Sequence, residues 1–149
     1  MTSIIYKKKN GDVMHYFYIN AVAVTASFRI PESHTFQQTL PLPPITTLIG
    51  IVGAAVGLDY EQAMQYRQKK GLLIGVTGTH KGKMNDLWKY RKIKSREVIS
   101  AVLLKEILVD LELTIVIGCE DKATLSELRK SFIKPRYALT AGTSDDLLK

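Results

Sequence analysis

Three stretches of the chain have the hydrophobic pattern of β-strands. In Leu111–Gly118 apolar residues stand at every second position, and this period of two is typical of a strand with one buried face. Met14–Ile30 is rich in aromatic and β-branched residues, which favour strands. Leu72–Thr77 is a shorter apolar run between two glycines and predicts a third strand.

Segments with helical spacing lie between these strands. Thr46–Leu58 is apolar and follows a group of prolines, and we predict that Thr46 or Thr47 caps the helix there, because a side-chain oxygen can accept a backbone N–H. Gln62–Lys70 continues as a helix. Thr124–Glu127 reads as a capping box and predicts the start of a last helix.

The order of these elements predicts an α+β fold. A last strand at Tyr137–Thr140 completes the β-α-β-β-α-β pattern of a ferredoxin-like domain, with an antiparallel sheet and both helices on one face. Residues 79–108 interrupt this pattern as a basic insertion, either a protruding hairpin or a helix–loop arm. Asn10-Gly11 predicts a small N-terminal hairpin. At 149 residues, the chain predicts one domain over residues 1–149.

Three glycines mark one face of the first predicted helix. Gly50, Gly53 and Gly57 are spaced i, i+3 and i+7, which places them on the same side. Glycine costs about 1 kcal/mol in a helix relative to alanine. The cluster therefore predicts a close approach of backbone, either to a sheet or to a bound chain, and helix packing is the simpler explanation.

Positive charge is concentrated in one part of the chain. The net charge is +7, and residues 79–96 hold seven basic residues against Asp86, which is 7 − 1 = +6. Trp88 and Tyr90 lie within this segment. A localised basic patch with aromatic residues is typical of nucleic-acid contact, although a solvated lysine-rich loop explains the charge equally well.

The sequence gives little support for metal, cofactor or membrane binding. A lone cysteine excludes a disulfide within the chain and a thiolate cluster, and the histidines His15, His34 and His80 are scattered, so we expect neither a metal nor a cofactor. The uncharged run Leu40–Leu58 is broken by prolines and is too short in its helical part to span a bilayer. A cytoplasmic protein is the expectation. Asp145 and Asp146 read as a solvated end of the chain.

Metal-independent RNA cleavage is an open alternative. Such a reaction needs a base for the 2′-hydroxyl proton and an acid or cation for the phosphate. The groups that could assemble in space are Tyr16, His34, His80, Lys81 and Lys83. Three histidines are unremarkable in a chain of this size, so binding without catalysis is favoured.

The most distinctive motif is Phe28-Arg29-Ile30-Pro31, followed by the Pro41–Gly50 brace and helix start and by Gly53-Ala54-Ala55-Val56-Gly57-Leu58. This motif resembles the signature of a CRISPR-associated family, the fifth Cas family of the RAMP superfamily. Lys105-Glu106-Ile107-Leu108 and Pro135–Asp146 resemble later family elements, although Thr143 stands where the family usually has arginine. The resemblance covers about Phe17 to Leu147.

The resemblance implies an RNA-recognition type of domain with an inserted hairpin and without the C-terminal subdomain of the family. It implies a non-catalytic subunit of a type I surveillance complex (Cascade) in antiviral defence, which caps the 5′ handle of the CRISPR RNA. The implied partners are that handle, the backbone subunit and the large subunit, with target DNA as a further candidate. An endoribonuclease that processes precursor CRISPR RNA is the alternative.

The residues expected to contact RNA fall into two groups. The first surrounds the glycine-rich helix and consists of Arg29, Thr46, Thr47 and Gly50. The second is the basic insertion and consists of Lys81, Lys83, Trp88, Lys89, Tyr90, Arg91, Lys92, Lys94 and Arg96. Single-stranded RNA needs cations for its phosphates, aromatic rings for its bases and close approach of the backbone, and the two groups together offer all three.

Overall fold

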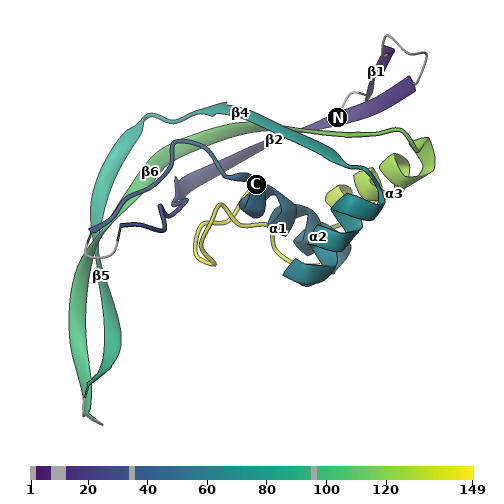
Figure 1. Ribbon diagram of the computed structural model, residues 1–149. Helices are drawn as coiled ribbons and strands as arrows, with labels where there is room; N and C mark the ends of the chain where they lie inside the picture. Colours follow the sequence, from purple (N-terminus) through teal and green to yellow (C-terminus); the bar gives the residue numbers. More distant parts are fainter. Residues whose placement is uncertain (1–2, 8–12, 34–35, 95–96) are drawn as a thin grey trace.

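A computed structural model of the chain describes residues 3–7, 13–33, 36–94 and 97–149. The strands are β1 (Ser3–Lys7), β2 (Val13–Ala26), β3 (Phe36–Gln37), β4 (Leu73–Thr79), β5 (Gly82–Lys94) and β6 (Glu97–Cys119), and the helices are α1 (Ile45–Val56), α2 (Tyr60–Lys69) and α3 (Lys122–Ile133). The fold is mixed α+β, as predicted, and one curved sheet contains all six strands (Figure 1).

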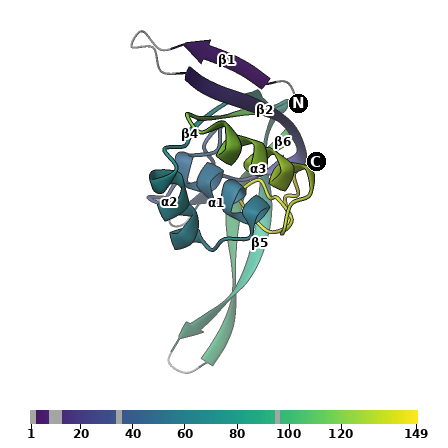
Figure 2. The same cartoon turned by 90° about the vertical axis from the view of Figure 1, so that its right-hand side faces the viewer.

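The long strand β6 is the centre of the sheet. Its C-terminal half lies between β2 and β4, so that Ile117 pairs with Phe17 on one side and Ile74 on the other, both antiparallel. Its N-terminal half pairs with β5, and Leu103 faces Trp88 there. A single strand therefore belongs both to the body and to a hairpin that projects away from the helices (Figures 1 and 2).

The helices cover one face of the body sheet and form the core with it (Figure 2). Phe17 and Leu113 from the strands pack with Leu48 and Val52 of α1. The ring of Phe17 meets that of Phe132 in α3 edge to face, with centroids 6.0 Å apart. Alternating apolar residues of β2 and β6 thus point towards the helices, as the period of two predicts.

The predicted strand Tyr137–Thr140 is wrong. Within this stretch Thr140 alone bridges, to Leu147. The amides of Arg136 and Tyr137 instead donate to the carbonyl oxygens of Ala55 and Ala54, each at 3.0 Å, near the C-terminus of α1. The segment therefore caps a helix, and the full ferredoxin-like strand order is not observed.

The predicted helix caps also differ from the structure. α1 begins at Ile45 with Pro44 at its N-cap, and within the described residues no side chain caps it. Thr46 and Thr47 consequently lie inside the first turn. α3 begins before the predicted capping box, because Asp121 accepts hydrogen bonds from the amides of Ala123 and Thr124.

Residues 82–94 of β5 pair antiparallel with residues 97–109 of β6 as a ribbon, and β2 and β3 pair with β6 at the base of this ribbon. The ribbon leaves the body at Asp110, where the backbone adopts a positive φ of 49°. The Lys81 ammonium contacts the Asp110 carboxylate at 3.0 Å beside this bend. Among the described strands, β5 pairs with β6 only, so its outer edge is open.

Candidate nucleic-acid interface

The base of the hairpin is held by a polar network around Glu106. Its Oε2 accepts a hydrogen bond from the Thr39 amide at 3.0 Å and contacts the Lys83 ammonium at 3.1 Å. The hydrogen bond from Thr39, assisted by Lys83, lowers the pKa of the Glu106 carboxyl below its ordinary value of 4.5. Two of the predicted RNA ligands, Lys81 and Lys83, are therefore already in ion pairs at the hairpin base.

Further along the hairpin, strand alternation separates the cations from the aromatic rings. Lys89 and Arg91 lie opposite Val102 and Ser100 on one face of the ribbon. Trp88 and Tyr90 belong to the other face by the same alternation, and their rings stack with centroids 6.4 Å apart. Trp88 is 48% exposed, so its ring does not form a buried core under the hairpin.

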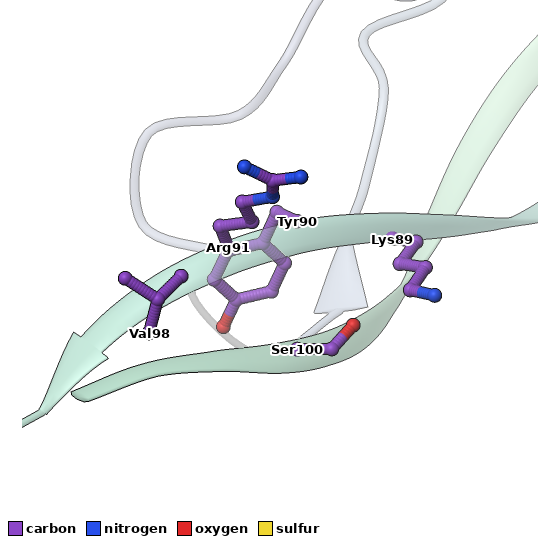
Figure 3. A pocket seen from close by; sticks show the side chains of 5 residues that line it. All are labelled: Lys89, Tyr90, Arg91, Val98 and Ser100. Carbon is purple, nitrogen blue, oxygen red and sulfur yellow. The ribbon is translucent and has the colours of Figure 1, made fainter.

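The hairpin carries a cavity of about 700 Å³ among the predicted ligands. Figure 3 shows its lining: Lys89, Tyr90 and Arg91 from β5, with Val98 and Ser100 from β6. Among the described residues no carboxylate pairs with Lys89 or Arg91. The cavity thus offers two cationic groups and a hydroxyl to a ligand, and Tyr90, whose ring stacks with Trp88 on the other face, lies at its border.

The sequence prediction missed Val98 and Ser100. Both residues come from the apolar strand that follows the basic segment. They lie beside the cations only because β5 and β6 pair in one register, from Lys94 with Glu97 to Gly82 with Val109. The one available signal is a hydroxyl residue at position 100 within an otherwise apolar stretch.

A second, separate cavity of about 240 Å³ lies along α1. It is lined by Thr47, Gly50, Ile51, Ala54, Thr140 and Gly142. A Cβ placed on Gly50 would meet no atom within 4 Å, so packing does not explain this glycine. Thr46 is exposed at the helix start, next to this cavity in sequence. Some members of each predicted group therefore line a cavity, and the two cavities are different: Thr47 and Gly50 line one, and Lys89, Tyr90 and Arg91 line the other.

Arg29 lies at the surface near the hairpin base. Its backbone bridges that of Thr39, and its side chain is exposed. No carboxylate within the described residues pairs with it, so the structural ion pair that was one possible role is not observed there.

Some predicted ligands cannot be placed as side chains. Arg96 lies outside the described residues, and Lys92 and Lys94 are described only as backbone of β5. Their contribution to RNA contact stays a prediction.

The candidate catalytic groups do not share a site. Tyr16 lies across Gly118, where an added Cβ would be 2.5 Å from its Cδ1. His80 follows Thr79, and Thr79 pairs with Glu112, which lies six residues along β6 from Gly118. At about 3.3 Å per residue, His80 and Tyr16 are therefore separated by roughly 20 Å along the sheet. His34 lies outside the described residues.

Metal and membrane signals are also absent from the described part of the chain. Its His, Cys, Asp and Glu side chains include no group of three or more that could hold a metal ion. No helix within it has the length and apolar character that a membrane span requires.

Of the two acidic residues predicted to form a solvated end, Asp145 is exposed but Asp146 is not. Asp146 is buried and accepts hydrogen bonds from the hydroxyls of Thr25 and Thr143, the latter at 2.6 Å. These bonds fix the segment that carries Thr140 and Gly142 beside α1, and so help to shape the second cavity.

Comparison with known proteins adds a family and a fold. A family model described as "CRISPR-associated protein (Cas_Cas5)" matches residues 21–145. A solved structure described as "CRISPR RNA-guided surveillance complex" superposes with a TM-score of 0.66 at 16% identity, over 90% of this chain and 60% of that one. Another, described as "Crystal structure of Cas protein", gives 0.53 at 20% identity, over 87% and 57%.

These solved structures share the fold with this chain, which spans about three fifths of their length. No curated protein sequence matches it.

Proposed function

Because the chain belongs to the CRISPR-associated family Cas5, we propose that it is an RNA-binding structural subunit of a type I surveillance complex. In this proposal it caps the 5′ handle of the CRISPR RNA and contacts the backbone and large subunits, with target DNA as a further candidate partner. A CRISPR-associated role follows from the family itself.

The observation that supports RNA binding is the hairpin cavity. Lys89 and Arg91 are cations without a described carboxylate partner, and phosphates are their natural ligands. The stacked rings of Trp88 and Tyr90 lie on the opposite face of the same ribbon, so bases would stack on one face while phosphates meet the cations on the other. Single-stranded RNA offers both groups on one flexible chain.

The cavity along α1 is the proposed second contact. Gly50 leaves room for a close approach, and the hydroxyls of Thr47 and Thr140 lie at the same cavity. Arg29, Thr46, Lys92, Lys94 and Arg96 complete the proposed contact set.

We also propose that residues 1–149 form a single RAMP-type domain with a ferredoxin-like core. The sheet order β2–β6–β4 supports this, because it is the order that the first three strands of such a fold adopt. The β5–β6 hairpin is then the basic insertion.

The proposal is tested by competition binding with repeat-handle RNA and a scrambled RNA of equal length. We expect preference for the handle and an affinity that falls steeply with salt. Lys89→Ala with Arg91→Ala should weaken binding at least tenfold and reduce the salt slope by about 1.4, at about 0.7 per phosphate contact on a single strand. Equal affinity for both RNAs, or an unchanged salt slope, would contradict the proposal.

A matched control removes the same charge elsewhere. Lys122 and Lys130 are exposed on α3, on the helical side of the body away from the hairpin. The double variant Lys122→Ala with Lys130→Ala should change affinity by less than about twofold, because neither residue lies at the proposed contacts. A loss equal to that of the hairpin variant would show that net charge alone drives binding.

A further inference from the structure

The direction of the hairpin is not fixed by β6 alone. The strand runs without interruption from body to hairpin, but it turns at Asp110, whose φ is 49°. Beyond this turn the described residues of β2 pair with only two more residues of β6, Val109 with Thr25 and Leu108 with Ala26. A two-stranded ribbon held by so short an attachment could swing relative to the body. Contacts on the far edge of β6 must therefore hold it in place.

Those contacts come from the segment of residues 36–40. Phe36 and Gln37 pair in parallel with Leu104 and Lys105 at the base of the hairpin. The same segment is bound to the end of β2, because the Leu40 amide donates to the Phe28 carbonyl at 2.8 Å. It thus touches the body and the hairpin at once.

Glu106 joins all the elements that meet at this point. Its carboxylate accepts from the Thr39 amide at 3.0 Å and contacts the Lys83 ammonium at 3.1 Å, and its backbone carbonyl accepts from the Ser27 hydroxyl at 3.2 Å. Lys83 also reaches the Thr39 carbonyl at 3.4 Å. The Glu106 side chain is only 18% exposed. We call Ser27, Thr39, Lys83 and Glu106 the Glu106 network.

We propose that Glu106 is a positioning residue that fixes the hairpin on the body and so orients Lys89 and Arg91 towards RNA. The part that concerns RNA rests on the proposed function. In this role Lys83 serves the network instead of contacting phosphate, which removes it from the set predicted from sequence.

Chemistry favours a carboxylate at this position. One oxygen receives both a backbone N–H and an ammonium, and hydrogen bonds with a charged partner are about twice as strong as neutral ones. An acid at the base of a cationic hairpin repels phosphate, so it would lower RNA affinity if it had no positioning effect.

The sign of the affinity change tests the role. If Glu106 is only a negative charge, Glu106→Ala should tighten RNA binding, since it removes repulsion and frees Lys83. If it positions the hairpin, Glu106→Ala should weaken binding at least fivefold. Glu112→Ala removes the same charge from an exposed site on the same strand and should change affinity by less than about twofold. Tightening by Glu106→Ala would overturn the proposal.

A double-mutant cycle tests the place of Lys83. Lys83→Met should weaken binding about as much as Glu106→Ala, and combining them should add little, because both break one network. Two outcomes would assign Lys83 to phosphate contact and contradict its place in the network. One is that the affinity losses of the two single variants multiply in the double variant, and the other is that the salt slope falls by about 0.7 in Lys83→Met alone.

A measurement without RNA separates this proposal from the proposed function. Amide hydrogen exchange in the β3–β6 ladder, where Phe36 and Gln37 pair with Leu104 and Lys105, should be at least tenfold faster in Glu106→Ala than in wild type, whereas the Leu113 amide in the central sheet should be unchanged. Unchanged rates in this ladder overturn the positioning role. If wild type binds no RNA, the proposed function fails, and the exchange rates alone decide whether Glu106 holds the hairpin.

Discussion

Three glycines at α1 have three different surroundings. A Cβ on Gly50 would meet nothing within 4 Å, whereas one on Gly53 would lie 2.9 Å from the Cβ of Ala63 in α2. Gly57 follows the helix with a φ of 95°, a conformation that side chains disfavour. Helix packing therefore explains Gly53, helix termination explains Gly57, and neither explains Gly50.

Alanine substitutions at the first two glycines should change stability in opposite directions. Gly50→Ala should raise the free energy of unfolding by about 1 kcal/mol, the usual gain within a helix. Gly53→Ala should lower it, because overpacking costs about 1–3 kcal/mol and Ala63 and the Leu58 carbonyl leave no room. Urea denaturation measures both, and stabilisation by Gly53→Ala would contradict the packing shown here.

The ionisation of Glu106 should couple stability to pH. Its pKa is lowered in the folded chain, chiefly by the Thr39 amide, so its stabilising effect is present above 4.5 and is lost as the pH falls through the folded value. Unfolding midpoints of wild type and Glu106→Gln should differ at about pH 7, and the difference should shrink as the pH is lowered below 4.5. A constant difference on acidification would contradict the assignment.

At the scale of elements, the bend in β6 determines the shape of the hairpin base. Leu108 and Leu111 are both fully buried, and Asp110 lies between them with a positive φ of 49°. Asp110 provides the change of direction, and its short polar side chain is among those that tolerate a left-handed backbone.

Substitutions at Asp110 should separate backbone strain from the ion pair with Lys81. Asp110→Val should destabilise by about 1–2 kcal/mol, the cost of a left-handed conformation for a side-chain-bearing residue. Asp110→Asn keeps that tolerance and loses only an exposed ion pair, worth about 0–1 kcal/mol. Thermal and urea unfolding compare the two, and equal losses would refute the backbone argument.

The elements that could be predicted from sequence are those with a strong local pattern. The strand at Leu111–Gly118 follows from its period of two, and the helix α1 from an apolar stretch that begins after a group of prolines. The segment at Tyr137–Thr140 has strand-forming residues, but its amides are taken by the end of α1, which no local pattern shows. The network around Glu106 joins residues far apart in sequence, so it depends on register that the sequence does not reveal.

At the scale of the whole molecule, the body and the hairpin present their cavities separately. One is lined by residues of the ribbon and the other by α1 with the segment at Thr140–Gly142. The basic segment could be predicted as a nucleic-acid contact from its charge. Lys81 and Lys83 at its base are in ion pairs, whereas Lys89 and Arg91 further out have no carboxylate partner among the described residues, and this division depends on where Asp110 and Glu106 lie in three dimensions.

The open outer edge of β5 has a consequence for the assembly state of the chain. Leu87 and Ile93 on this strand are 70% and 77% exposed, and unpaired apolar edges readily add a strand from another molecule. Lys89 and Arg91 stand between them and oppose such pairing by mutual repulsion. Lys89→Ala with Arg91→Ala should therefore promote self-association, visible as faster sedimentation at higher concentration, whereas wild type stays monodisperse. The cations proposed to attract phosphate would then also keep copies of the protein apart.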